Sequence, residues 1–376
     1  MTSDLMIRAS GGLNATEFAA AVDQIGAELY CHGDQGYTVF AVNTLSTFTE
    51  QALKLLQGVI FSPGLSKSDF KLIKQQYLGQ LKASRSSSGF KLNQQMYSGI
   101  FGNNHPMGNI STEKGYKSVK LADTKLRYDE LINSNGAIVI AIGDLVPSKM
   151  SDTLEQMFQG LKAGEAPAKT AEVTENLIPE QLVKVEKAGV TQTTVMIAKP
   201  APGRTADGYY DRVVSNYILG GGGFESRLML EIRNKLGNTY GIHSSIPGGE
   251  NCGLYQINVT TRNDQLHETL DAIRSVTDSY CKNGPTPEEL NDALQYYTGH
   301  YHLITERPSQ VVSRIIAYER MGLGMNELYD YPEKVSAVNV NSATAAAYKY
   351  LTFDKMTYGL EGPKDVLSGA AAHLNI

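Results

Sequence analysis

The chain has 376 residues, of which 41% are hydrophobic and 19% charged, and its formal net charge is −5. This length exceeds that of one ordinary core and predicts two domains, while the composition is that of a folded globular protein. The basic residues are scattered, which argues against nucleic acid as a main partner, because a phosphate backbone requires a concentrated basic face. No apolar run approaches the roughly 20 residues of a membrane-spanning helix.

The first half of the chain contains alternating strand and helix signals. Residues 37–44 (YTVFAVNT) alternate along the chain and are rich in β-branched side chains, which predicts a strand. Amphipathic spacing predicts a helix over 49–61. A later apolar strand is expected over 137–145 (AIVIAIGDL), and a further helix over about 148–158.

The second half repeats this order of elements. Residues 254–261 match the first strand, residues 264–281 match the first helix, and residues 355–363 stand where 137–145 stood. Thr286 and Glu289 have the spacing of a capping box at the start of a long helix. Such a repeat predicts two copies of one α/β unit.

Residues 164–181 separate the two copies and have the small, charged, proline-marked composition of a linker. We therefore expect domains over 1–163 and 182–376, joined by this linker. Each domain is expected to lay its helices on one face of a mostly antiparallel sheet. The predicted fold class is α+β, with two homologous domains.

Metal-binding patterns are absent from the sequence. The seven histidines form neither H-E-x-x-H nor H-x-x-E-H, the spacings that place two imidazoles on one face of a helix. His300 and His302 fall in a predicted helix, where their side chains point about 200° apart and cannot share one metal. Cys31, Cys252 and Cys281 form no C-x-x-C pair and are expected to be free thiols. We expect no metal bound by this chain.

The stretch GGGGFESRLMLEIRNKLGNTYGIHS, residues 220–244, predicts a tight turn from a strand into a helix, and then another strand. The four glycines lack the G-K-[ST] that makes a phosphate loop specific. Gly237 is placed to stop the helix. Arg233 then lies in its last turn, and Tyr240 begins the next strand. A purely structural role would also explain both residues. A positive charge is stabilising near a helix C-terminus, and tyrosine is common in strands.

The segment SRLMLEIRNKLGNTYGI resembles the C-terminal-domain motif S-R-L-x-x-x-[LI]-R-x-x-x-G-x-x-Y of the pitrilysin and insulinase family of zinc metallopeptidases. This family includes the mitochondrial processing peptidases and bacterial two-subunit relatives. Residues 11–42 and 101–109 are similar to earlier landmarks of the family, so the resemblance covers nearly the whole chain. It implies two homologous domains that together form half of a clam-shell.

In active family members, H-x-x-E-H and a downstream glutamate hold zinc, and the paired domain contributes an arginine and a tyrosine seven residues later. These two side chains hold the substrate backbone and help to stabilise the oxyanion. Arg233 and Tyr240 match the two positions, whereas the helix expected to carry the downstream glutamate reads KLIKQQYLGQ. The resemblance implies further substrate contacts from four neighbouring residues, Gly221, Gly222, Ser226 and Arg227.

The resemblance therefore implies a non-catalytic, substrate-binding subunit of a heteromeric zinc-dependent peptidase, inactive alone and without a cofactor of its own. The expected partners are a peptide substrate and either a zinc-bearing homologous subunit, which would hold the zinc in a heterodimer, or a second copy of the chain. One alternative is an active zinc metallopeptidase, because the family's first strands and helix precede the part that this sequence resembles. The other is a non-proteolytic assembly subunit. Bacterial relatives favour a periplasmic over a cytoplasmic location.

Overall fold

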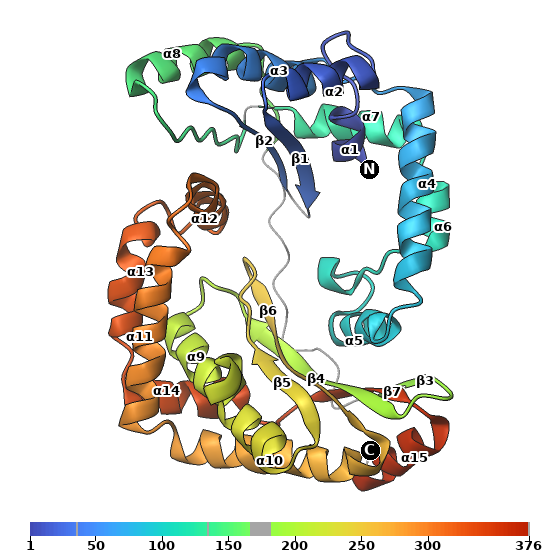
Figure 1. Ribbon diagram of the computed structural model, residues 1–376, viewed down its shortest axis with the longest axis vertical. Coiled ribbons are helices and arrows are strands. Elements are labelled where there is room, and N and C mark those ends of the chain that lie inside the picture. The colour runs from blue at the N-terminus through green and yellow to red at the C-terminus, as the bar shows by residue number, and fades with distance from the viewer. Residues whose placement is uncertain (35–36, 134, 166–181, 375–376) are drawn as a thin grey trace. The chain divides into compact units, whose positions relative to one another are not determined.

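The computed structural model describes residues 1–34, 37–133, 135–165 and 182–374 (Figure 1). Packing divides the chain into two compact units. One contains Met1–Ser84 and the described part of Ser111–Thr170, and the other contains Arg85–Ile110 and the described part of Ala171–Ile376. Nearly all of the predicted linker at 164–181 lies outside the described residues. Among the helices of these ranges, none has both the length and the apolar character needed to cross a bilayer.

The first unit combines a two-stranded hairpin with helices. Strands β1 (Glu28–Asp34) and β2 (Tyr37–Asn43) pair antiparallel. The predicted strand at 37–44 and the predicted helices at 49–61 and 148–158 are confirmed. The helices of this unit are α1 (Thr2–Met6), α2 (Ala15–Gln24), α3 (Thr49–Phe61), α4 (Lys67–Ser84), α6 (Glu113–Ser118), α7 (Leu121–Leu131) and α8 (Pro147–Phe158).

The strand predicted at 137–145 is wrong, because these residues form no strand in the structure. Their apolar side chains stay in solvent, and Ile138 is 51% exposed. The equivalent segment of the second half is β7 (Thr357–Gly362), which pairs with β3 (Leu182–Glu186) on one edge and β4 (Gln192–Pro202) on the other. The described residues of the first unit supply no such flanking pair, and an apolar run without a ladder partner is not held as a strand.

The second unit is built, within its described residues, on a five-stranded sheet of order β3-β7-β4-β6-β5. β6 (Cys252–Arg262) lies inside the sheet, and β5 (Thr239–Ser245) is an edge strand. β3 and β7 pair in parallel, and the other neighbours pair antiparallel. The mostly antiparallel sheet agrees with the predicted α+β class, and the strands predicted at 254–261 and 355–363 are confirmed.

One face of this sheet carries the main core of the second unit. Val195, Ile197 and Ile257 are buried in one cluster with apolar side chains of the helices. The capping box of Thr286 and Glu289 is present at the start of α11. The helices after β3 are α9 (Tyr209–Asn216), α10 (Leu266–Asn283), α11 (Pro287–Leu303), α12 (Pro308–Arg320), α13 (Glu327–Ser336), α14 (Val340–Ala346) and α15 (Lys364–Leu374).

The opposite face of the sheet is partly covered by α5 (Phe90–Phe101), which comes from the first half of the sequence. Side chains alternate along a strand, so Met196 of β4 faces away from the main core. There it packs with Leu92 and Met96 of α5. The sequence did not indicate this packing of residues 85–110 on the second unit.

A buried carboxylate ties the start of α5 to the sheet. Glu361 of β7 is 4% exposed and accepts hydrogen bonds from the Ser88 hydroxyl (3.0 Å), the Gly89 backbone N–H (3.1 Å) and Lys187 Nζ (3.1 Å). Burial alone would raise the pKa of Glu361, but the hydrogen bonds from Gly89, Lys187 and Ser88 hold that pKa below its ordinary value. The carboxylate that holds α5 is therefore ionised at neutral pH.

Candidate functional site

The glycine run links the helical turn η3 (Tyr217–Gly221), which packs against the edge strand β5, to the 3-10 turn η4 (Gly223–Glu225). Gly220 and Gly221 are the last residues of η3, which is π-helical. A Cβ at Gly220 would lie 2.5 Å from Ser244 Oγ, so glycine allows η3 to approach β5 closely. The run is a tight turn, but it follows a helix and not the predicted strand, because the preceding residues form α9 and η3.

Arg233 lies in the last turn of η5 (Met229–Lys235), as predicted from the sequence. The helix is π-helical, with the Leu236 N–H donating to the Glu231 carbonyl, and such wide turns recur at functional sites. The Arg233 guanidinium stacks 4.6 Å from the centre of the Phe224 ring. The Arg233 side chain makes no hydrogen bond or ion pair with another described residue. Its charge is therefore available to a ligand.

Tyr240 projects from a β-bulge on the edge strand β5 and is 91% exposed. Thr239 stands opposite Thr261 and Ile242 opposite Val259, so two residues, Tyr240 and Gly241, face the single residue Thr260. The Thr239 hydroxyl fixes the bulge by donating to the Thr260 carbonyl (2.7 Å) and accepting from the Gly241 N–H (3.1 Å). A bulge re-aims the side chain it carries. The Tyr240 phenol thus extends into solvent next to η5, which packs on β5.

The other predicted substrate-binding residues take structural positions around this pair. Ser226 is buried and donates to the Gly223 carbonyl (2.8 Å). Arg227 makes a two-pronged ion pair with Glu289, with both N–O distances 2.7 Å, and also donates to the Gly284 carbonyl. Gly221 and Gly222 form the turn itself. We propose that these four residues act by holding the turn that presents Arg233.

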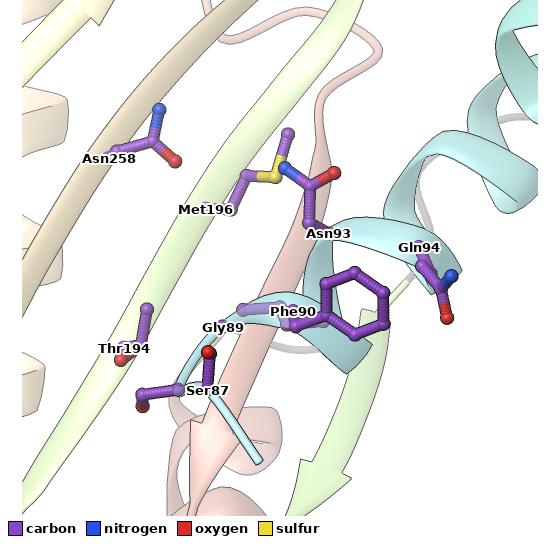
Figure 2. Close-up of a pocket in the computed structure, with 10 residues that line it drawn as sticks. Ser87, Gly89, Phe90, Asn93, Gln94, Thr194, Met196 and Asn258 are labelled. Carbon is purple, nitrogen blue, oxygen red and sulfur yellow. The ribbon is translucent and has the colours of Figure 1, made fainter. Parts of the chain in front are cut away.

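A shallow pocket opens on the same face of the sheet as α5, within the second unit (Figure 2). It encloses about 440 Å³, in the range of ligand pockets. Its walls come from the start of α5, from β4 and from β6. The lining residues are Ser87, Ser88, Gly89, Phe90, Leu92, Asn93, Gln94, Thr194, Met196 and Asn258, none of which carries a charge.

The ligands for a catalytic zinc do not come together in the part of the chain that the structure describes. No group of three His, Cys, Asp or Glu side chains there is close enough to hold a metal ion. His300 and His302 lie on the helix α11, as predicted. Cys31, Cys252 and Cys281 are free and buried. The described residues do not fit the zinc that an active family member would hold, so no chemical step of this chain is assigned to zinc.

The second unit thus carries Tyr240 exposed on its edge strand, next to a helical turn that ends near Arg233, and no metal site is found among the described residues. Comparison with known proteins agrees, since residues 118–297 match the family described as "Peptidase M16 inactive domain". An uncharacterized zinc protease of Streptomyces coelicolor is 22% identical, over 91% of this chain and 76% of that protein. A "non-peptidase homolog" of Helicobacter pylori is 23% identical, over 88% and 76%.

Among solved structures, the peptidase M16 inactive domain from Pseudomonas fluorescens is 27% identical, with a TM-score of 0.88, over 96% of this chain and 87% of that chain. Residues 118–297 are therefore similar to the peptidase M16 inactive domain, and the family resemblance seen in the sequence is confirmed. The family description and the name of the Helicobacter pylori relative fit a non-catalytic subunit.

Two features of the site were missed from the sequence. Phe224 is 63% exposed and forms the aromatic surface under Arg233. Its signal was present, because a large apolar residue directly after four glycines has little chain around it to bury it. The pocket beside α5 had no such signal, since its walls are far apart in sequence.

Proposed function

We propose that the chain is a peptide-binding, non-catalytic subunit of a two-chain zinc-dependent peptidase, and that it contributes Arg233 and Tyr240 to a zinc site held by its partner. The observation that carries this proposal is the exposure of Tyr240 on a bulged edge strand, against which packs the helical turn that carries Arg233, an arginine without an ion pair to any described residue. A tyrosine so exposed gains little from packing, so its position has no stability explanation.

The two side chains suit the backbone of a bound peptide. The Tyr240 hydroxyl can donate to a carbonyl oxygen, and the Arg233 guanidinium presents several donors together with a positive charge. Both groups bind an oxygen more strongly as negative charge develops on it, which is the requirement for stabilising a tetrahedral intermediate. Bond cleavage itself is assigned to the partner, and we place the complex in the periplasm.

Binding of a peptide by the purified chain tests the proposal. In fluorescence anisotropy with a labelled, unstructured peptide of neutral composition, the wild-type chain is expected to bind without a partner. Arg233→Ala should weaken binding by about 10- to 150-fold, since a hydrogen bond to a charged group contributes about 1.5–3 kcal/mol.

The control is Tyr329→Phe, which alters an exposed tyrosine of α13 and should leave the affinity unchanged. Absence of binding by the wild-type chain would favour a non-proteolytic assembly subunit and contradict the proposal. Equal affinity of the Arg233→Ala and wild-type proteins would contradict the role of the arginine.

A further inference from the structure

We propose that the pocket between α5, β4 and β6 is a subsite that selects an uncharged side chain of the bound peptide, about three residues from the one that Tyr240 contacts. This inference rests on the proposed peptide-binding function and adds a specificity that neither the family description nor the relatives' names assign. Three observations support the proposal: the position of the pocket on the sheet, the uncharged residues that line it, and the side-chain amides there that have no hydrogen-bond partner among the described residues.

The register of the sheet places the pocket and Tyr240 in one row that runs across the strands, from β4 over β6 to β5. Thr194 of the pocket stands opposite Thr260, and Thr260 stands opposite the bulge that carries Tyr240. The Thr194 and Thr260 hydroxyls lie 3.5 Å apart, so this row runs along one face of the sheet. Two strand spacings separate Thr194 from β5, or about 10 Å. An extended peptide that crosses this face of the sheet, at right angles to the strands, rises about 3.3 Å per residue, so about three of its residues span that distance.

The polar groups of the pocket suit a neutral peptide. The side-chain amides of Asn93 and Asn258 make no hydrogen bond to the described residues, and both lie at the pocket (Figure 2). Each amide offers donors and an acceptor, which is the complement of a peptide group. Met196 and Phe90 supply apolar surface between them. This combination of an apolar floor and a few polar groups is typical of a site that takes one side chain with its adjoining backbone.

The charges around the pocket exclude an anionic ligand. A helix N-terminus such as that of α5 attracts anions, but the Gly89 N–H and the Ser88 hydroxyl already donate to Glu361. A second carboxylate there would be repelled by the negative charge of Glu361. An acidic peptide side chain would also lose hydration without a counter-charge, because no lining residue is positive. The pocket should therefore prefer leucine or methionine to aspartate.

The test is a set of otherwise identical labelled peptides that carry leucine, glutamine or aspartate at one position, scanned along the peptide. The wild-type chain is expected to bind the leucine peptide about 10-fold more tightly than the aspartate peptide at one position of the scan. Asn258→Lys and Asn93→Lys should each reduce or reverse that preference at this position. Asn93 is an exposed helix residue, so its variant keeps the test valid if a change in β6 disturbs folding.

The matched control is Asn291→Lys, on the exposed surface of α11, which should retain the wild-type preference. If the wild-type chain binds peptides without discrimination at any position, or if both pocket variants keep its preference, the subsite is refuted while the proposed function stands. Failure of the wild-type chain to bind any peptide of the set would instead refute the proposed function.

Discussion

Tyr240→Phe is expected to lower kcat by about 10²- to 10³-fold when the chain is assembled with its zinc-bearing partner from the same organism. The substitution removes only the phenolic hydroxyl, and at 91% exposure the ring has little protein packing to lose. In our proposal that hydroxyl donates to the oxygen on which negative charge develops, so its loss raises the barrier by about 3–4 kcal/mol. The measurement is peptidase activity under saturating substrate, with the thermal stability of the variant checked separately.

Tyr329→Phe provides the matched comparison, because it removes the hydroxyl of another exposed tyrosine in the same unit. It should leave kcat unchanged. If Tyr240→Phe and Tyr329→Phe assemblies are both as active as wild type, Tyr240 has no part in the reaction. A rise in KM with unchanged kcat would show that the Tyr240 hydroxyl binds the substrate and the transition state equally and does not act in the chemical step.

Glu361→Ala is expected to lower the free energy of unfolding of the second unit by about 3 kcal/mol at pH 7, because removing a buried carboxylate leaves the buried groups that donate to it without an acceptor. The Gly89 N–H and the Ser88 hydroxyl would lose their acceptor, and Lys187 would lose its counter-charge. Chemical denaturation followed by circular dichroism measures the change. Ser88→Ala provides a milder comparison. It should lower the free energy of unfolding by about 1 kcal/mol, since it removes a single hydrogen bond.

The stability difference between the wild-type protein and Glu361→Ala is expected to depend on pH in one direction. The pKa of Glu361 is lower in the folded protein than its ordinary value of 4.5, so its ionised form stabilises the fold. That contribution is complete above the ordinary pKa and is lost as the pH falls through the folded value. The difference between wild type and Glu361→Ala should therefore narrow in acid, below about pH 4.5. A difference that stays constant into that range would show that the Glu361 charge does not hold α5.

Local signals predicted much of the fold. Helix α3 has the bounds predicted from the sequence, 49–61. Its formation depends on the spacing of apolar residues within the segment itself, which the sequence shows directly. The capping box of Thr286 and Glu289 formed as expected, since a cap depends on residues three apart. Arg233 and Tyr240 took their predicted places at a helix end and a strand start for the same reason.

Features that depend on distant residues could not be predicted in this way. The apolar run 137–145 has the composition of a strand, but pairing decides whether it becomes one, and the described first unit offers it no ladder. The packing of α5 on the second unit depends on Met196 and on Glu361, which lie far along the chain. The pocket follows from that packing. The bulge at Tyr240 depends on how β5 meets β6, which spacing alone does not reveal.

The zinc content of the purified 376-residue chain tests the central claim most directly, since the claim separates peptide-binding groups from a metal site. After incubation with zinc and dialysis against metal-free buffer, elemental analysis is expected to find only trace zinc, because the described residues gather no ligand set. One tightly held zinc ion per chain would contradict the account and identify the protein as a metallopeptidase in its own right.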